Sequence, residues 1–263
     1  MYFDSHSHYY DSKLLSQTEN ESVDSLIDAL LLDGYVSYIV NVGTNTNNSP
    51  VAIEQAKKHR NMYAAVGIHP SDCSEENDIE SALSSIESLI MNNRETVVAI
   101  GEIGLDYYWE PVQRELQAEY FEAQLQMAQR LDMPVIIHDR EAHGDCFDTV
   151  MKYKNVRGVF HSYSGSAEMA KELIRHGWYI SFSGTVTFKN AVRVAEVAKS
   201  LPHDRVLIET DCPYLTPHPH RGKINHSGYL KYTNAALASL WDVSEHECAQ
   251  ITLNNAKTFF GIS

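Results

Sequence analysis

Two histidines near the amino terminus, separated by one residue, are the first candidates for chemistry. His6 and His8 follow the short apolar segment Met1–Phe3 and come directly after a predicted first β-strand over Tyr2–Ser5. Alternate residues of an extended chain project to the same face, so the two imidazoles could bind one metal ion. A His-x-His pair is a weak signal alone, and a metal site needs further ligands from elsewhere in the chain.

The rest of the chain alternates strand-like and helix-like segments. Apolar runs rich in Val, Ile and Tyr predict eight strands, at Tyr2–Ser5, Val36–Val42, Tyr63–Ile68, Val97–Ile103, Pro134–His138, Gly158–His161, Tyr179–Ser183 and Val206–Thr210. Helical patterns occupy Asp24–Leu32, Pro50–His59, Ile79–Met91, Gln113–Leu131, Cys146–Tyr153, Ala167–His176, Ala191–Ser200, Tyr229–Trp241 and Glu245–Phe260. This α/β alternation predicts a (β/α)8 TIM barrel in one domain over residues 1–263, although an open doubly wound sheet shares the pattern.

Polar residues are concentrated where the predicted strands end. In a barrel these C-terminal ends form one rim, at which catalytic residues collect. We predict that a pair of metal ions is surrounded there by His6, His8, Glu102, His138, His161 and Asp211, with Glu102 placed to bridge. Each residue alone could instead be a hydrogen-bonded core histidine or a paired acid, but their coincidence at one rim favours the metal site.

Composition restricts the class of protein. The 263 residues are 43% hydrophobic and 21% charged, which is ordinary for a globular chain with one large core. No apolar run approaches the roughly 18 to 20 residues of a membrane span, and the start of the chain lacks the pattern of a secretory leader. The four cysteines form no C-x-x-C pair. We therefore expect a cytoplasmic protein with no membrane association and no obligate protein partner.

Charge and missing motifs restrict the ligand. With 21 Lys and Arg against 35 Asp and Glu, the net charge of −14 opposes broad electrostatic capture of a nucleic-acid duplex. A phosphate substrate would have to be held locally, by a divalent metal or a small basic cluster. The Gly-x-Gly-x-x-Gly and Walker patterns are both absent, which argues against a nucleotide cofactor.

An ordered set of motifs runs from the first residues into the final quarter of the chain. These motifs are Phe3–His8, Val66–Pro70, Ile100–Tyr108, His138–Arg140, His161–Ser166, Ile180–Gly184 and Glu209–Leu215. With these motifs the chain resembles the TatD family of metal-dependent deoxyribonucleases, within the amidohydrolase-like barrels. The resemblance implies a (β/α)8 fold and 3′-to-5′ hydrolysis of single-stranded DNA or of strand ends.

The resemblance also implies how the ligands divide. His6, His8, Glu102 and Asp211 would hold one metal, and Glu102 with His138 and His161 would hold the other. The chain departs from the family in one loop, where it reads Asn225-His226-Ser227 and the family tends to read Asn-Glu-Pro. We expect that loop to border the site and to affect substrate preference more than metal chemistry.

Two divalent ions would supply the chemistry of phosphodiester hydrolysis. They lower the pKa of a bound water from 15.7 to about 7 and polarise the phosphate, so no protein nucleophile is needed. Catalytic roles then fall to Glu102 as the bridge and to Asp211 as general base, although Asp211 could equally be only a ligand. Histidine-rich ligation favours Zn, Mn, Fe or Ni, whereas family members are often assayed with Mg, so the ion stays open among Zn, Mg and Mn.

Further residues could contact the substrate. Arg140 could bind a phosphate, or pair with Asp139 or Glu141. His69 could bind the substrate or a metal ligand, or only order its turn, and Arg221 lies in a basic loop that a phosphate chain could enter or that could simply be solvated. The aromatic run Tyr107–Trp109 could stack unpaired bases, or pack beneath a loop.

Two other functions compete with a nuclease. One is a hydrolase of small amides, lactones or phosphotriesters, or of the ester of an aminoacyl-tRNA, on the same barrel. Several amidohydrolases bridge their metals with a modified lysine, so Glu102 at the fourth strand favours the nuclease branch. The other is a metal-binding protein without catalysis, which the complete set of expected ligands disfavours.

Overall fold

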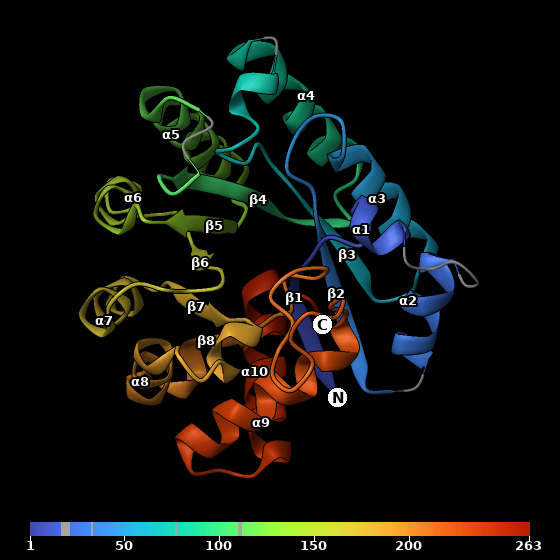
Figure 1. Ribbon diagram of the computed structural model, residues 1–263. Coiled ribbons are helices and arrows are strands. Elements are labelled where there is room, and N and C mark those ends of the chain that lie inside the picture. Colours follow the sequence, from blue (N-terminus) through green and yellow to red (C-terminus); the bar gives the residue numbers. More distant parts are fainter. Residues whose placement is uncertain (17–21, 33, 77, 110–111) are drawn as a thin grey trace.

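Eight parallel strands form a single sheet in the part of the chain that the structure describes. The computed structural model describes residues 1–16, 22–32, 34–76, 78–109 and 112–263. The strands pair in sequence order, each parallel to the next. They are β1 (Tyr2–Ser7), β2 (Val36–Val42), β3 (Met62–Val66), β4 (Val97–Asp106), β5 (Val135–Arg140), β6 (Gly158–Phe160), β7 (Tyr179–Phe182) and β8 (Val206–Ile208). Figure 1 shows them as a ring with helices outside it.

The first and last strands nearly close the sheet into a barrel. Ser7 forms a parallel bridge with Cys212, just beyond β8. The His8 amide donates to the Cys212 carbonyl at 2.8 Å, and the Asp211 amide donates to the His6 carbonyl at 2.9 Å. This arrangement confirms the predicted (β/α)8 TIM barrel. It also brings the His-x-His pair next to Asp211, although the two lie at opposite ends of the chain.

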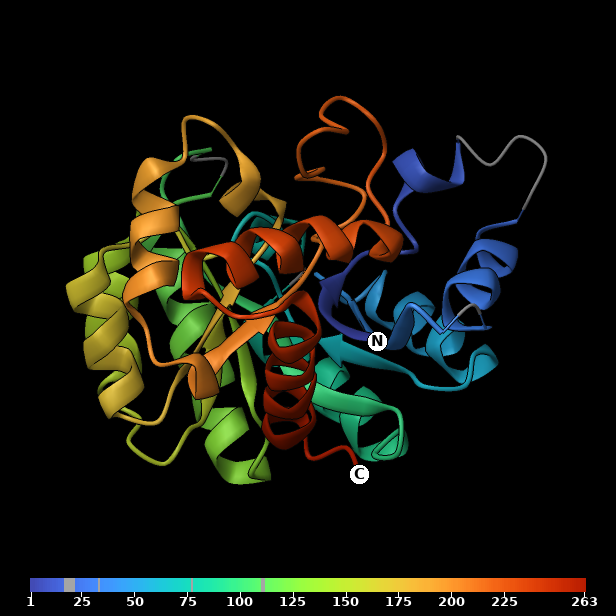
Figure 2. The ribbon, with the colours of Figure 1, turned by 90° about the horizontal axis from the view of Figure 1, so that it is seen from below.

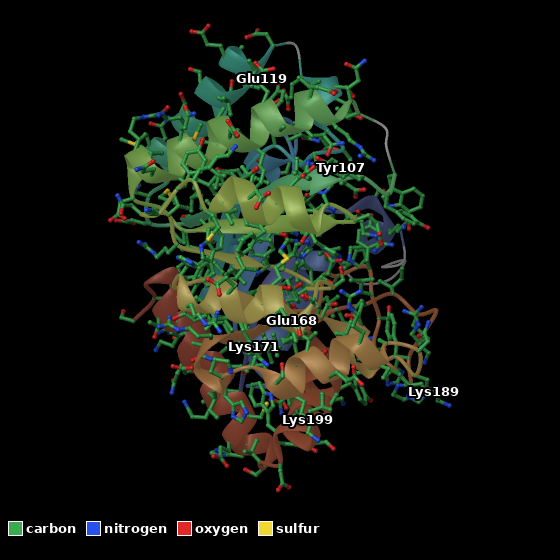
Figure 3. The ribbon with its side chains drawn as sticks, turned by 90° about the vertical axis from the view of Figure 1, so that its left-hand side faces the viewer. Tyr107, Glu119, Glu168, Lys171, Lys189 and Lys199 are labelled. Carbon is green, nitrogen blue, oxygen red and sulfur yellow. The ribbon has the colours of Figure 1, made fainter. Side chains whose placement is uncertain are left out.

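Helices cover the outside of the ring. In the described residues they are α1 (Ser12–Leu15), α2 (Val23–Leu32), α3 (Ser49–Lys58), α4 (Ile79–Asn92), α5 (Arg114–Leu131), α6 (His143–Val150), α7 (Ala167–Arg175), α8 (Val192–Ser200), α9 (Leu230–Trp241) and α10 (Glu245–Phe260). Short 3-10 turns lie at Cys73–Glu75, Gly184–Thr187, His203–Arg205 and Ser227–Tyr229. The outer faces of α5, α7 and α8 are charged and exposed, as Glu119, Glu168 and Lys199 illustrate (Figure 3).

The barrel interior is apolar below the rim. One buried cluster takes residues from every strand, namely Phe3, Val40, Val42, Ala65, Ala99, Ile136, Val159, Tyr179 and Leu207. Only the interior is shared by all eight strands, so these side chains fill it. Phe259 and Phe260 of α10 join the cluster, where Phe260 stacks on Phe3 at 5.5 Å between ring centroids. Helix α10 thus packs against the beginnings of the strands, which leaves their C-terminal ends for the site.

The segments at the rim come from both ends of the chain. Figure 2 shows helix α1 and the segment between β8 and α9 at one end of the molecule, with the C-terminus at the other. No helix within the described residues is long and apolar enough to cross a membrane.

Several predicted boundaries were wrong in instructive ways. Strand β1 continues to Ser7 instead of ending at Ser5, and β4 continues to Asp106 instead of Ile103. We predicted that these strands end at polar residues, but both strands continue and carry functional side chains in their last few residues. Helix α6 begins at His143 instead of Cys146, because its N-terminal residue Ala142 makes no side-chain cap that a sequence could announce.

Candidate metal centre

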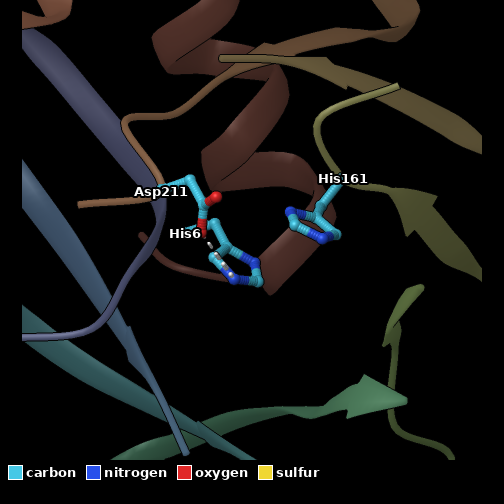
Figure 4. A group of neighbouring side chains, drawn as sticks. All are labelled: His6, His161 and Asp211. Atoms are coloured by element: carbon cyan, nitrogen blue, oxygen red, sulfur yellow. Dashed lines mark ion pairs between the residues drawn. The ribbon is translucent and has the colours of Figure 1, made fainter. Parts of the chain in front are cut away.

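The six predicted ligands converge at the rim. Three overlapping groups of side chains could each hold a metal ion, and within each group the imidazole nitrogen and carboxylate oxygen atoms lie within 4.8 Å of one another. The groups are His6, His161 and Asp211; His6, His8 and Glu102; and His69, Glu102 and His138. Figure 4 shows His6, His161 and Asp211 projecting from three different strand ends into one space. Strands β1, β4, β5 and β6 and the segment after β8 therefore supply the set.

One oxygen of Glu102 faces the residues from the ends of the chain. Its Oε2 lies 3.3 Å from His6 Nε2 and 3.8 Å from His8 Nε2. Asp211 Oδ1 completes this group, at 3.8 Å from His6 Nε2 and 3.4 Å from His8 Nε2. Two nitrogens and two carboxylate oxygens thus surround one point.

The other oxygen of Glu102 faces a second group. Its Oε1 lies 2.6 Å from His138 Nδ1 and 2.7 Å from His161 Nε2. His69 Nε2 lies 3.6 Å from the same oxygen. A single buried carboxylate therefore separates two clusters of nitrogen ligands, which is the position of a bridging ligand between two ions.

The donor set fits divalent metal ions. His6 Nε2 and His8 Nε2 are 3.1 Å apart. Two nitrogens that bind one zinc ion at about 2.0–2.1 Å with a tetrahedral angle lie about 3.3 Å apart. Nitrogen and carboxylate donors in this number suit Zn or Mn, and the carboxylates also accept Mg.

Three of the remaining ring nitrogens are held by other groups, whereas His6 Nδ1 is buried and has no hydrogen-bond partner among the described residues. His8 Nδ1 donates to the Val42 carbonyl at 2.7 Å. His138 Nε2 lies 3.0 Å from Asp106 Oδ2, and His161 Nδ1 lies 3.2 Å from Glu209 Oε1. Such outer partners orient a ligating imidazole and fix which nitrogen faces the metal.

Asp106 and Glu209 were not among the predicted site residues. Both acids were visible at strand ends, and Asp106 lies four residues after Glu102 on β4, so strand periodicity places the two on one face. That periodicity was the available signal for Asp106. Glu209 comes directly after β8 and reaches His161 across the end of β7, which no spacing in the sequence announces.

Burial and mutual charge set the pKa values of the cluster. Burial alone would raise the pKa of Glu102, but His161, His69 and His6 hold it well below its ordinary value. Burial opposes protonation of His138, yet hydrogen bonds to Asp106 and Glu102 raise its pKa to about 8. His69 is the opposite case, because burial and the neighbouring His138 lower its pKa to about 3. Before metal binds, His138 therefore carries a proton at neutral pH.

This proton predicts a pH dependence of metal affinity. A metal must displace the proton from His138 and also that from His161, whose pKa the carboxylates of Glu102 and Glu209 raise well above its ordinary value. Affinity is therefore expected to rise with pH between 6.5 and 8.5, by on the order of tenfold or more per unit. Titration calorimetry with Mn²⁺ or Zn²⁺ on the metal-free protein at pH 6.5, 7.5 and 8.5 measures this. An affinity that is unchanged between pH 6.5 and 8.5 would contradict the assignment of His138 as a ligand.

Asp106→Asn tests the outer partner of His138. The variant removes the charge that orients the ring, so metal affinity at pH 8 is expected to fall about 10- to 100-fold. Asp145→Asn is the matched control, because Asp145 accepts from the Tyr107 hydroxyl at 2.8 Å and contacts no predicted ligand. Equal affinities for the two variants would mean that Asp106 is only a structural partner.

Hydrogen bonds from other segments hold the turn that carries Asp211 in place. Asp211 adopts a left-handed backbone with φ 56°, a conformation that costs a non-glycine residue about 1 kcal/mol or more. Next to it, the Thr210 amide and hydroxyl donate to the buried Asp4 carboxylate at 2.9 and 2.6 Å. Asn225 donates to the Thr210 carbonyl at 2.9 Å. These bonds hold the strained turn in place.

The loop that departs from the family contributes to these hydrogen bonds. The Ser227 hydroxyl donates to Asp4 at 2.6 Å and is fully buried. His226 packs against Tyr229 and lines neither of the two cavities that meet at the ligand cluster. The His226 side chain therefore does not line these cavities, while Asn225 and Ser227 of the same loop support the turn of Asp211; the effect of the loop on substrate preference stays a prediction.

The predicted substrate residues lie in different positions. His69 lines the cavity beside the ligands and belongs to the second nitrogen group. Arg140 lines an adjoining cavity and stacks over Tyr108 at 4.5 Å, with no ion pair to Asp139 or Glu141 among the described residues. Arg221 lines neither cavity, and its guanidinium stacks on Phe188 at 3.8 Å.

The aromatic run after β4 divides in the same way. Tyr107 donates to Asp145 and packs under Arg114, so it is a structural residue. Tyr108 and Trp109 are 53% and 71% exposed and meet edge to face at 5.0 Å. Trp109 lines both cavities, which leaves its ring free to contact a ligand.

Comparison with known proteins gives a consistent picture. The family described as "TatD related DNase" matches residues 3–261. The chain is 40% identical to the uncharacterized metal-dependent hydrolase YabD of Bacillus subtilis, over 100% of both chains. It is 35% identical to the uncharacterized metal-dependent hydrolase TatD of Mycobacterium tuberculosis, over 92% of each.

A solved structure supports the same relationship. The crystal structure of YJJV, a TatD homolog from Escherichia coli K12, superimposes with a TM-score of 0.90 at 27% identity. The match covers 100% of this chain and 98% of that one. A TatD-family hydrolase from Entamoeba histolytica superimposes with a TM-score of 0.83 at 21% identity, which bears on the fold alone.

Proposed function

Since the chain belongs to the TatD-related DNase family and is a metal-dependent hydrolase, we propose that it hydrolyses phosphodiester bonds as a 3′-to-5′ exodeoxyribonuclease on single-stranded DNA. The observation that carries this proposal is the position of Glu102, whose two oxygens face two separate groups of nitrogen ligands. A phosphodiester carries one negative charge shared by its two non-bridging oxygens, and further charge develops on the leaving oxygen during hydrolysis; a pair of cations can stabilise both.

In this proposal the ligands divide around Glu102. His6, His8, Asp211 and Glu102 would hold one ion, and Glu102 with His138 and His161 would hold the other. When bound, the two ions, of Zn, Mg or Mn, supply a water of lowered pKa and polarise the scissile phosphate. His69 belongs to the second nitrogen group but is not a ligand in this proposal; its Nε2, 3.6 Å from Oε1 of Glu102, can donate to a phosphate oxygen.

Asp211 is the proposed general base. Its side chain is 15% exposed, compared with 0% for His6 and 5% for Glu102, so it is the most accessible of the three. Burial raises its pKa, but a hydrogen bond from His8 and the charges of His6 and His161 lower it overall, so Asp211 is ionised at neutral pH. A carboxylate in this state can take the proton of the attacking water.

The surroundings of the centre fit a single nucleic-acid strand. Trp109 and Tyr108 offer exposed rings on which unpaired bases can stack. Arg140 is placed in the adjoining cavity, where it can contact a phosphate. Because the net charge is −14, this attraction is local, which favours strand ends or single strands over a duplex held along a basic face.

We also propose that the enzyme works in the cytoplasm without an obligate partner. The four cysteines are unpaired and buried, which suits a reducing compartment. Each of their thiols is also distant from a second cysteine in sequence.

A digestion assay combined with metal analysis tests the proposal. The purified protein, loaded with Mn²⁺, Mg²⁺ or Zn²⁺, is incubated with a single-stranded DNA oligonucleotide that carries a label at its 5′ end. Progressive shortening from the 3′ end that stops with a chelator and resumes with metal is the expected result. Intact DNA alongside rapid turnover of a lactone, a phosphotriester or an aminoacyl-tRNA would instead assign the barrel to one of those substrates.

A further inference from the structure

Two cavities meet at the ligand cluster and extend in different directions from it. They share the wall residues Trp109, His138, His161, Asp211 and Tyr214. The first, of about 440 Å³, we call the Asp72 arm; its outer wall is Tyr10, Asp11, Thr44, Asn48, Ser71 and Asp72. The second, of about 680 Å³, we call the Arg140 arm; its outer wall includes Lys13, Arg140, Ser162, Ser164, Thr185 and Phe188.

The two arms differ in charge. Among the described residues, the walls of the Asp72 arm hold no Lys or Arg and include three acids beyond the predicted ligands, namely Asp11, Asp72 and Asp106. Beyond the predicted ligands, the Arg140 arm has one acid, Asp139, and two cations. Each cation lies over an aromatic ring, Arg140 over Tyr108 at 4.5 Å and Lys13 over Tyr214 at 4.3 Å. Phosphates are attracted into the Arg140 arm and repelled from the Asp72 arm.

Asp72 is held in a fixed orientation. Its Oδ2 accepts from the Thr44 hydroxyl and from the Asn45 side-chain amide, both at 2.8 Å. Thr44 is fixed in turn, because its hydroxyl accepts from the side-chain amide of Asn48 at 2.8 Å. Both hydrogen bonds to the Asp72 carboxylate use Oδ2, and within the described residues Oδ1 has no hydrogen-bond donor, so it is left to accept from a ligand. A carboxylate oxygen in this state binds a hydroxyl group and opposes a phosphate.

We propose that the Asp72 arm receives the free-hydroxyl end of the substrate strand and that Asp72 is a specificity-determining residue which rejects an end carrying a phosphate. The rest of the strand then follows the Arg140 arm. This inference rests on the proposed nuclease function and adds to it a reason for attack at chain ends. A strand that continued through both arms would place a phosphate against Asp72 and Asp11.

Terminal phosphates test the proposal directly. The substrates are one internally labelled single-stranded oligonucleotide in three forms: hydroxyl at both ends, phosphate at the 3′ end, and phosphate at the 5′ end. The wild-type enzyme is expected to lose about tenfold or more in kcat/KM when the phosphate is on the end that it attacks, as one added like charge at close range predicts. A phosphate on the opposite end is expected to have little effect.

Asp72→Asn identifies the residue responsible. Asparagine has the same shape and keeps an acceptor for Thr44, so the arm is expected to keep its form while losing the charge. The penalty for a terminal phosphate is expected to shrink to about threefold or less. Glu76→Gln is the matched control: Glu76 follows in the same segment, accepts from Thr46 at 2.8 Å and lines neither arm, so its penalty should equal that of the wild type.

The outcomes separate the two proposals. If the unmodified oligonucleotide stays intact with metal loaded, the nuclease function is wrong and the inference falls with it. If it is shortened but all three forms react at equal rates, or if Asp72→Asn keeps the full penalty, the inference alone is wrong. Shortening with a penalty that only Asp72→Asn relieves supports both.

Discussion

Glu102→Ala is expected to abolish hydrolysis and to remove at least one metal ion. Glu102 faces both nitrogen groups, with one oxygen 3.3 Å from His6 Nε2 and the other 2.6 Å from His138 Nδ1. Without it, the four imidazoles remain, but the negative charge that would offset the two cations is lost. Activity on a single-stranded oligonucleotide is expected to fall by about 10³-fold or more, and metal content measured by mass spectrometry should fall with it.

A second substitution separates charge from folding. Glu102→Gln keeps the volume of the side chain but offers one neutral oxygen, so it should retain more metal than Glu102→Ala while still losing most activity. Thermal unfolding of both variants in the metal-free form checks that the barrel is intact. Full activity with two bound ions in Glu102→Ala would contradict the bridging role.

Asp211→Asn is expected to lower kcat while metal stays bound. His6, His8 and Glu102 remain to hold the ion, and asparagine keeps one oxygen toward it. Loss of the base should reduce kcat by about 10²- to 10⁴-fold with little change in KM. Metal content measured by mass spectrometry gives an independent readout, and it should stay at the wild-type value.

The alternative role of Asp211 predicts a different pattern. If Asp211 serves only as a ligand, metal content should fall in parallel with activity, and excess metal should restore the rate. Asp145→Asn, which removes a carboxylate outside both arms, should leave kcat unchanged. Rescue of Asp211→Asn by added metal would contradict the assignment as base.

Much of the barrel could be predicted from the sequence because its signals are local. Each strand is a short apolar run, and each is followed by a helical period, so the number and order of elements were accessible. The rim followed from one rule, since parallel strands bring their C-terminal ends together. That rule brought together His6 and Asp211, which lie in the first and the last quarter of the chain; His6 Nε2 and Asp211 Oδ1 are 3.8 Å apart.

What could not be predicted depends on how side chains meet across strands. Glu209 supports His161 from the end of β8, and Asp4 braces the turn of Asp211 from inside β1. Neither contact has a sequence spacing of its own. The different charges of the two arms are a further example. Asp72 follows β3 and Arg140 ends β5, and the two lie near the same ligand cluster only because the strands form a ring.

The central claim is that two divalent ions bind on the two sides of Glu102. Anomalous diffraction from crystals grown with Mn²⁺ or Zn²⁺ tests it most directly. We predict two peaks, one beside Oε2 with His6, His8 and Asp211, and one beside Oε1 with His138 and His161. A single peak with no contact to Glu102, or no peak at this rim in metal-saturated crystals, would contradict the account.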